Sequence, residues 1–267
     1  MTAGNDHLLA RELAVEAGRR LLELRARGGQ PDLLRKAGDR LSHEFLAAAI
    51  ATRRPGDVVL SEEGADDPAR LTAGRVWIVD PLDGTREFGE PGRTDWAVHV
   101  ALWERSGASG PGDLTAGAVA LPAQGQVLST AAPGERGRAG EAVEVAEDGD
   151  GSGKVRIVVS RTRAPRLVRN ISDLIDTELV PLGSAGAKVA AVVCGEADAY
   201  VHAGGFYEWD TAAPVAVARA AGCHASRVDG SPLAYNQAGL LMPDILICRP
   251  ALAGTLLQAI REVTNAS

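Results

Sequence analysis

The chain has 267 residues, 45% of them hydrophobic and 24% charged, which is the composition of a globular protein with a sizeable core. Its formal net charge of −7 and the lack of a lysine- or arginine-rich block argue against a nucleic-acid polymer as a partner. No apolar run approaches the roughly 20 residues of a membrane helix, and residues 1–6 are polar without a signal-peptide pattern. We therefore expect a cytoplasmic protein without a membrane partner.

Apolar periodicity along the first half predicts two helices followed by five strands. The helices are expected at residues 7–27 and 39–50, and the strands at 58–60, 76–79, 96–103, 115–121 and 126–130. The second half predicts three strands, at 155–160, 197–202 and 245–248, and four helices, at 166–176, 187–194, 211–221 and 252–263. Between the halves, residues 133–153 lose all periodicity, which predicts a linker. We expect one domain, with an N-terminal lobe at about 1–132 and a C-terminal lobe at about 154–267.

Two carboxylates, Asp80 and Asp83, follow the apolar strand within the segment 76–88. Pro81 is expected to stop this strand. Asp83 is a good N-cap, so the free amides of residues 84–86 would open a helix and face an anion. Asp-Gly is also among the commonest turn dipeptides, and this segment alone leaves the turn and the site equally open.

Three further carboxylates stand at strand ends or helix starts. Glu62 follows a predicted strand, while Asp39 and Asp210 each stand at the start of a predicted helix. The alternatives are a solvated loop for Glu62 and plain N-caps for Asp39 and Asp210. Hard divalent cations such as magnesium prefer oxygen ligands and commonly bridge carboxylates to a substrate phosphate. With Asp80 and Asp83, these residues predict a metal-dependent phosphate site.

In this scheme Asp80 bridges two ions about 4 Å apart, with the Leu82 carbonyl as a further ligand. The amides of Gly84 and Thr85 hold the phosphate, and the Thr85 hydroxyl, oriented by Asp39, activates the attacking water. Haloacid-dehalogenase-type phosphatases are disfavoured because one residue separates their aspartates, whereas two separate Asp80 from the next aspartate here. A Walker-type nucleotide loop is also disfavoured because its Gly-Lys-Ser/Thr ending is missing.

A second glycine turn, Gly183 to Lys188, again places open amides at a helix start and adds an ammonium group. A lysine suits a phosphate as a point charge. The alternative is a close-packing turn with a surface lysine, and the sequence of the turn leaves both possibilities open.

Three separated motifs carry a resemblance to a known family: Ser61-Glu62-Glu63, Trp77 through Thr85, and Trp209-Asp210-Thr211-Ala212-Ala213. In this order and at these separations they resemble the inositol monophosphatase superfamily of lithium-sensitive, magnesium-dependent phosphatases. Three more segments are similar to its CysQ-type 3′(2′),5′-bisphosphate nucleotidases, namely Arg86-Glu87-Phe88, the 183–188 turn and Pro232-Leu233-Ala234-Tyr235-Asn236.

The resemblance implies an α+β fold, a layered αβαβα sandwich, in a homodimer with two or three Mg²⁺ ions per site. The implied activity is hydrolysis of the 3′-phosphate of 3′-phosphoadenosine 5′-phosphate to AMP and phosphate. Inositol 1-phosphate and fructose 1,6-bisphosphate are the alternative substrates. A non-catalytic phosphate- or metal-sensing protein is the alternative of another class.

The resemblance also implies residue roles in this sequence. The implied metal ligands are Glu62, Asp80, the Leu82 carbonyl, Asp83 and Asp210. The implied catalytic residues are Asp39, Thr85 and Glu62. The implied substrate contacts are Gly84, Thr85, Arg86, Gly183, Ser184, Lys188 and Tyr235.

Overall fold

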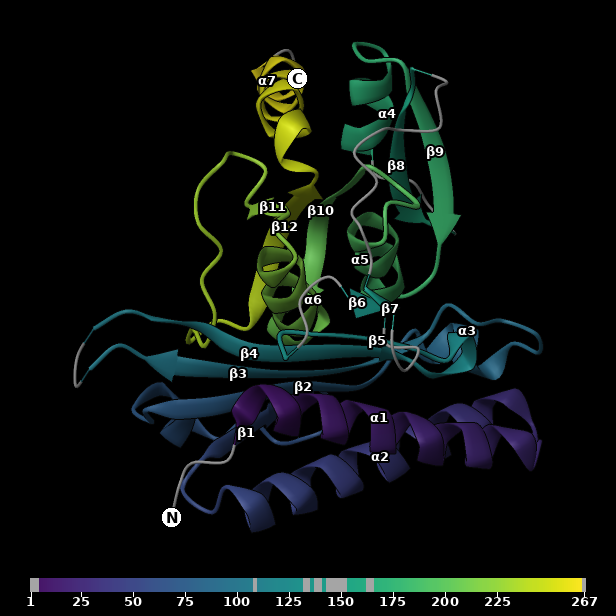
Figure 1. The fold of residues 1–267 in the computed structure, drawn as a ribbon, viewed down its shortest axis with the longest axis vertical. Coiled ribbons are helices and arrows are strands. Elements are labelled where there is room, and N and C mark those ends of the chain that lie inside the picture. Colours follow the sequence, from purple (N-terminus) through teal and green to yellow (C-terminus); the bar gives the residue numbers. More distant parts are fainter. Residues whose placement is uncertain are drawn as a thin grey trace.

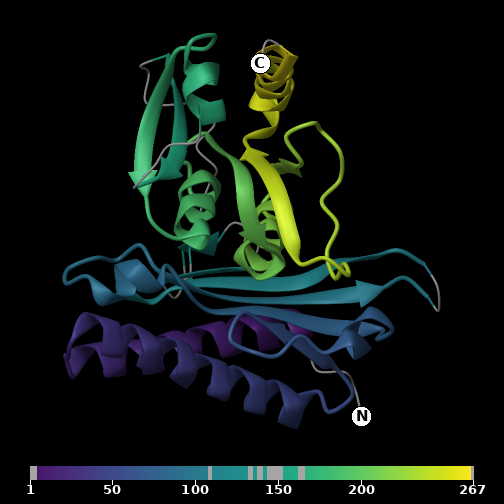
Figure 2. The same cartoon turned by 180° about the vertical axis from the view of Figure 1, so that it is seen from behind.

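Five alternating layers of helix and sheet build the protein (Figures 1 and 2). The structure is a computed structural model that describes residues 5–107, 110–131, 135–136, 141–142, 153–161 and 166–265. The layers are a helix pair, a five-stranded sheet, a second helix pair, a second five-stranded sheet and an outer helix layer. This arrangement confirms the predicted α+β layered αβαβα sandwich. Among the described helices, none combines the length and the apolar character that a membrane crossing requires.

The first sheet has the strand order β1-β2-β3-β4-β5, with β1 parallel to β2 and the other neighbours antiparallel. Its strands are β1 (Val58–Ser61), β2 (Arg75–Asp83), β3 (Ala97–Arg105), β4 (Gly112–Leu121) and β5 (Gln126–Ser129). Two long helices, α1 (Asp6–Ala26) and α2 (Pro31–Arg53), cover one face with their apolar sides. The strands expected at 115–121 and 126–130 are confirmed as β4 and β5, which pair antiparallel.

The second sheet has the order β11-β12-β10-β8-β9. Its strands are β11 (His224–Ser226), β12 (Leu241–Cys248), β10 (Ala199–Tyr207), β8 (Val155–Ser160) and β9 (Thr177–Leu182). The outer layer consists of α4 (Arg166–Ser172) and α7 (Ala253–Asn265), whose apolar residues pack with this sheet. The sequence patterns missed β9 and β11, because β9 is only half-buried and β11 has three residues.

The middle layer holds α5 (Ala185–Val193) and α6 (Glu208–Ala220), which lie between the two sheets. Every residue of α5 is buried, as expected for a helix that is apolar on all sides. Small side chains allow the close approach of α6 to β4. A Cβ on Gly117 would lie 2.7 Å from the Ala216 Cβ.

Shorter elements complete the fold. They are η1 (Pro68–Leu71), α3 (Thr85–Gly89), η2 (Pro122–Gln124), β6 (Glu135–Arg136), β7 (Glu141–Ala142) and η3 (Pro250–Leu252). The predicted linker, residues 133–153, lies mostly outside the described residues. The division into two lobes therefore stays a prediction.

Two predicted boundaries near the carboxylates were wrong. The second helix begins at Pro31, so Asp39 lies in its third turn and is not an N-cap. The early turns of this helix expose Leu33 and other residues, which hid its start from the apolar pattern. β2 runs through Pro81 to Asp83, because its pairing with β3 is irregular between Asp80 and Asp83 and places no ladder bond at the proline.

Two further helix starts were also displaced. The N-cap of α3 is Gly84, with a φ of 82°, and not Asp83, which still belongs to β2. α6 begins at Glu208, so Asp210 is its third residue, and its carboxylate accepts from the N–H of Tyr207 at 2.7 Å. Pro214 therefore lies in the second turn and not in the first.

Candidate active site

Three carboxylates meet where the end of β2 approaches the start of α6. Oxygens of Asp80, Asp83 and Asp210 lie within 4.8 Å of one another. The irregular end of β2 turns around Asp80, whose Oδ1 accepts from the Leu82 N–H at 3.0 Å. We call Asp80, Asp83 and Asp210 the acidic cluster. Asp210 follows the other two aspartates by 127 positions or more, so only the packing of α6 on the first sheet brings it to them.

Asp83 is tied to the middle helix layer and to β3. Its Oδ2 accepts from the Ser184 hydroxyl and from the Gly186 N–H at 2.8 Å, and His99 Nε2 lies 3.1 Å away. Burial alone would raise the pKa of Asp83, but His99 and these hydrogen bonds outweigh it and lower the pKa. Asp83 is therefore held as a carboxylate.

The pKa values of the other two cluster carboxylates, and of Glu62 beside them, are shifted in the opposite direction. Burial, followed by repulsion from Asp83, raises the pKa of Asp210 to about 6, and burial with three acidic neighbours raises that of Asp80 well above its usual range. Glu62 is exposed as a whole residue in the turn after β1, but desolvation of its carboxyl group and repulsion from Asp210 raise its pKa to about 7. Acidic oxygens this crowded fit a hard divalent cation, which would relieve the repulsion.

The turn that carries Glu62 is held from α2. The Gly64 N–H donates to the Ser61 carbonyl at 3.1 Å, and His43 Nδ1 lies 2.9 Å from the Ser61 hydroxyl. His43 and Asp39 are four residues apart on α2, so the same helix face contacts both the turn after β1 and the start of α3.

The structure brings Asp39 to Thr85 as predicted, although from the middle of a helix. Thr85 Oγ1 lies 3.2 Å from Asp39 Oδ1 and 2.9 Å from the Leu82 carbonyl oxygen. Burial, with repulsion from Glu63, raises the pKa of Asp39 to about 6. Gly38 permits this contact, because a Cβ there would lie 2.8 Å from the Phe88 ring and hold α2 away from α3.

The two predicted glycine turns lie against each other. A Cβ on Gly84 would lie 3.2 Å from both the Asp95 carbonyl oxygen and the Ser184 Cβ, and the φ of 82° also favours glycine. Ser184, the N-cap of α5, has a φ of 46°, which is uncommon for a residue with a side chain. The Gly183 N–H donates to Asp95 Oδ2 at 2.6 Å. Both turns therefore belong to one site.

The remaining predicted substrate contacts differ in their placement. Lys188 is buried, and its ammonium donates to the Ser184 carbonyl at 2.8 Å and the Gly183 carbonyl at 3.3 Å. Arg86 is exposed on α3, with its Nε 3.5 Å from Glu90. Tyr235 is 2% exposed and donates its hydroxyl proton to Thr211 at 3.1 Å, so the structure does not present its ring to a ligand.

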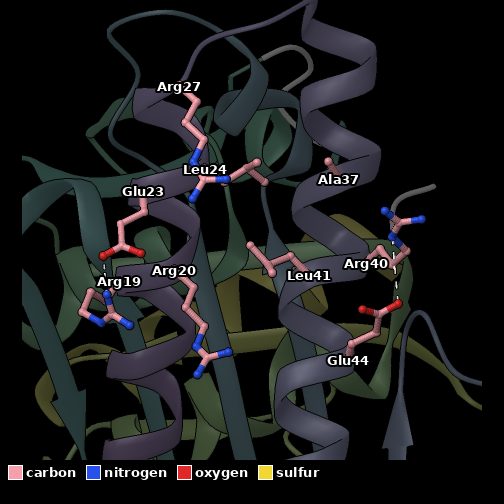
Figure 3. A pocket seen from close by; sticks show the side chains of 9 residues that line it. All are labelled: Arg19, Arg20, Glu23, Leu24, Arg27, Ala37, Arg40, Leu41 and Glu44. Carbon is pink, nitrogen blue, oxygen red and sulfur yellow. Dashed lines mark hydrogen bonds and ion pairs between the residues drawn. The ribbon is translucent and has the colours of Figure 1, made fainter.

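A separate groove lies between α1 and α2, on the helix pair that covers the first sheet (Figure 3). It is lined by Arg19, Arg20, Glu23, Leu24, Arg27, Ala37, Arg40, Leu41 and Glu44. Arg19 pairs with Glu23 and Arg40 lies 3.9 Å from Glu44, as the dashed lines show. None of the lining residues belongs to the acidic cluster, so we separate this groove from the site.

Comparison with known proteins places this geometry in a family. The inositol monophosphatase family matches residues 9–265. The chain belongs to the inositol monophosphatase family. It is 51% identical over 263 residues to the 3′-phosphoadenosine 5′-phosphate phosphatase of Mycobacterium leprae, covering 97% of this chain and 94% of the relative. The 3′(2′),5′-bisphosphate nucleotidase CysQ of Escherichia coli K12 is 32% identical over 204 residues, which cover 75% and 78% of the two chains.

Solved structures of the inositol monophosphatase family share the fold. Inositol monophosphatase-II from Staphylococcus aureus MSSA476 has a TM-score of 0.76 at 23% identity, covering 93% of this chain and 92% of that one. The Thermotoga maritima IMPase has a TM-score of 0.74 at 19% identity, with coverage of 98% and 99%. The predicted family is thus confirmed, and it is one of metal-dependent phosphatases that act on small phosphate esters.

Sequence reasoning on this inositol monophosphatase family member missed His99 and Asp95. His99 is fully buried, and its Nδ1 lies 3.3 Å from the Trp209 carbonyl, so one ring contacts residues on both sides of the acidic cluster. A Cβ on Gly186 would lie 2.3 Å from His99 Nε2, which explains the glycine there. The signal that could have found His99 was strand pairing, because His99 on β3 lies opposite Asp80 on β2.

The metal-free protein should lose thermal stability as the pH rises from about 5 to about 7.5. The pKa of Asp210 is raised from 3.8 to about 6 and that of Glu62 from 4.5 to about 7. Carboxyl groups with raised pKa values favour the fold while protonated, and this contribution is lost as the pH passes the folded-state values. Melting curves in EDTA should show the fall, and added MgCl₂ should raise the melting temperature most at the higher pH.

Asp210→Asn provides the control for this stability profile. It removes one of the titrating groups, so its melting temperature in EDTA should depend less on pH than that of the wild type. A wild-type melting temperature that stays constant or rises over this range would show that the acidic cluster carries no repulsion in the metal-free protein.

Proposed function

We propose that this protein is a Mg²⁺-dependent phosphomonoesterase that hydrolyses the 3′-phosphate of 3′-phosphoadenosine 5′-phosphate to AMP and phosphate. The observation that carries the proposal is the convergence of the Asp39–Thr85 pair and the glycine turn at Gly84 on the acidic cluster. The relatives named for this reaction at 51% identity support the choice of substrate.

Five ligand groups would hold the metal ions, two or three in number: Glu62, Asp80, the Leu82 carbonyl, Asp83 and Asp210. When bound, Mg²⁺ polarises the phosphoryl oxygens and acidifies water. Asp83, kept ionised by His99 and the start of α5, is a ligand of fixed charge and position. Asp80 and Asp210 release protons as cations enter, because their pKa values are raised in the empty cluster.

Proton transfer in the proposed reaction depends on Thr85 and Asp39. Asp39, as a carboxylate, accepts the proton of the Thr85 hydroxyl, and Thr85 Oγ1 then accepts a proton from the attacking water. The water oxygen bonds to phosphorus while the bond from phosphorus to the 3′-oxygen breaks. A second water protonates that oxygen, and the proton held by Asp39 neutralises the hydroxide that this leaves. The amides of Gly84 and Thr85, near the start of α3, would stabilise the phosphoryl oxygens.

A substrate panel at matched Mg²⁺ tests the proposal. We expect kcat/KM to be highest for 3′-phosphoadenosine 5′-phosphate and lower for inositol 1-phosphate and fructose 1,6-bisphosphate. Equal or faster turnover of inositol 1-phosphate would reject the nucleotide as the preferred substrate. Absence of Mg²⁺-dependent turnover on every ester would favour a phosphate- or metal-sensing protein.

Lys188→Met should raise KM for 3′-phosphoadenosine 5′-phosphate by about tenfold and change KM for inositol 1-phosphate much less. Lys188 is the buried cation of the second glycine turn, and a substrate with two phosphates needs positive charge beyond the metal ions. Methionine retains most of the side-chain volume of the buried lysine. Initial-rate kinetics with the two substrates measure the effect, and equal changes in both KM values would remove Lys188 from recognition of the second phosphate.

We also propose a homodimer, on the basis of the family resemblance. Light scattering coupled to size-exclusion chromatography tests it. A mass near the 27.7 kDa of one chain would reject the dimer.

A further inference from the structure

One aromatic side chain is exposed, and it lies at the start of the helix that carries Asp210. The sequence contains three Phe, four Trp and three Tyr, all within the part of the chain that the structure describes. Among these aromatic residues only Tyr207 is exposed, at 44%. The tryptophans and the other two tyrosines are buried, and Phe45 and Phe206 are half-buried. An exposed large ring is an informative exception in a fold that buries its other rings.

The backbone fixes Tyr207 beside the acidic cluster. Tyr207 is the last residue of β10 and the N-cap of α6, and its N–H donates to Asp210 Oδ2 at 2.7 Å. The Cα that carries its ring is bonded directly to the amide nitrogen that contacts the cluster. A ligand with a phosphate at the cluster would therefore lie at the end of α6 that begins with Tyr207.

The ring of Tyr207 is also held rigid. It stacks on the Trp209 ring with a centroid distance of 4.7 Å and an interplanar angle of 8°. Trp209 is 8% exposed, so the lower ring is fixed in the core and covers one face of the tyrosine. The exposed area of Tyr207 then belongs to its opposite face and edge, and a flat, fixed π-face is the surface on which a nucleobase stacks.

The other tyrosines do not offer such a face. Tyr235, the base contact implied by the family resemblance, is buried and bonded to Thr211. Tyr200 is 1% exposed and lies under Lys188, whose Nζ is 5.4 Å from the ring centroid. Of the three tyrosines, only Tyr207 therefore offers its ring to a base.

We propose that Tyr207 binds the purine base of the substrate by stacking and so determines the preference for a nucleotide. This inference rests on the proposed function, whose site it extends from the phosphate to the base. In it Tyr207 stacks the base, Asp210 next to it belongs to the metal site, and Lys188 in α5 meets the second phosphate.

Variants of Tyr207 test the inference through two substrates. Tyr207→Leu keeps an apolar side chain without a π-face, whereas Tyr207→Phe keeps the stacking ring. We expect Tyr207→Leu to raise KM for 3′-phosphoadenosine 5′-phosphate by about tenfold, with a much smaller change for inositol 1-phosphate, which has no base. Tyr207→Phe should restore the nucleotide KM. Leu174→Ala, which truncates a side chain that is 52% exposed after α4, is the matched surface control and should leave both KM values unchanged.

A binding measurement separates this inference from the proposed reaction. Calorimetry with AMP and with ribose 5-phosphate, in the presence of Mg²⁺, compares ligands that differ by the base. The wild type should bind AMP more tightly, and Tyr207→Leu should lose most of that difference even if the substrate panel rejects the nucleotidase activity. Equal effects of Tyr207→Leu on both ligands, or on both substrates, would overturn the inference and show that Tyr207 acts only by placing Asp210.

Discussion

Asp80→Asn should abolish phosphatase activity and at the same time raise the melting temperature of the metal-free protein. Asp80 is 1% exposed, and burial with Asp83, Glu62 and Asp210 raises its pKa well above the usual range. If Asp80 is a metal ligand as proposed, loss of its carboxylate oxygen should lower kcat/KM by at least about 100-fold, the scale of a lost electrostatic contact in a transition state. Removal of a crowded buried carboxyl group should raise the melting temperature in EDTA by about 5 °C.

Fluorimetry in EDTA and steady-state kinetics in saturating Mg²⁺ measure the two effects of Asp80→Asn. Asp113→Asn is the matched control, because this carboxylate is 69% exposed and pairs with Arg219 on the surface. It should change neither activity nor melting temperature appreciably. If Asp80→Asn left turnover unchanged, Asp80 would be a strand-end residue without a catalytic role. A lower melting temperature would show that its carboxyl group stabilises the metal-free fold.

Thr85→Val should lower kcat by about 100- to 10,000-fold with little change in KM, which is the range of general acid–base catalysis. Valine keeps the shape of threonine but removes the hydroxyl that lies 3.2 Å from Asp39 and 2.9 Å from the Leu82 carbonyl. The proposed substrate contacts of the glycine turns and Lys188 would be unchanged. Initial rates over a range of substrate concentrations separate kcat from KM.

Thr85→Ser and Asp39→Asn complete the Thr85 experiment. Serine keeps the hydroxyl and should retain most activity. If the hydroxyl and the carboxylate act as one unit, Asp39→Asn combined with Thr85→Val should be no slower than the worse single variant. Multiplicative losses in the double variant would mean that Asp39 and Thr85 act independently, and a large rise in KM alone would make Thr85 a binding residue.

The structure brings predicted site residues together but corrects the local structure expected around them. Glu62, Asp80 and Asp210 were recognised as candidate ligands because acidic residues at the ends of apolar segments are aimed by rigid elements. Asp83 was expected as an N-cap, and an N-cap was the alternative for Asp39 and Asp210. None of the three is an N-cap, although Asp39 still contacts Thr85. Capping preferences are local, and here the packing of α2 against β2 and α3 decided where the helices begin.

Several site properties could not be read from local patterns at all. The single ring of His99 contacts Asp83 and the Trp209 carbonyl because β2, β3 and α6 pack together, and its place in an apolar strand resembled that of a core residue. The burial of Tyr235 and the exposure of Tyr207 likewise depend on how β10 and α6 meet. Short-range sequence patterns contain no information on such exposure.

By themselves the sequence motifs identified the family, and that resemblance implied the layered α+β fold and a metal-dependent phosphatase, because each motif is carried by neighbouring residues. Only the tertiary structure decided which carboxylates lie together and which of them stay charged. Asp83 keeps a lowered pKa while Asp80 and Asp210 are raised, although all three have the same chemistry in the unfolded chain. The difference arises because only Asp83 receives donors from α5 and His99, and only folding brings those donors to it.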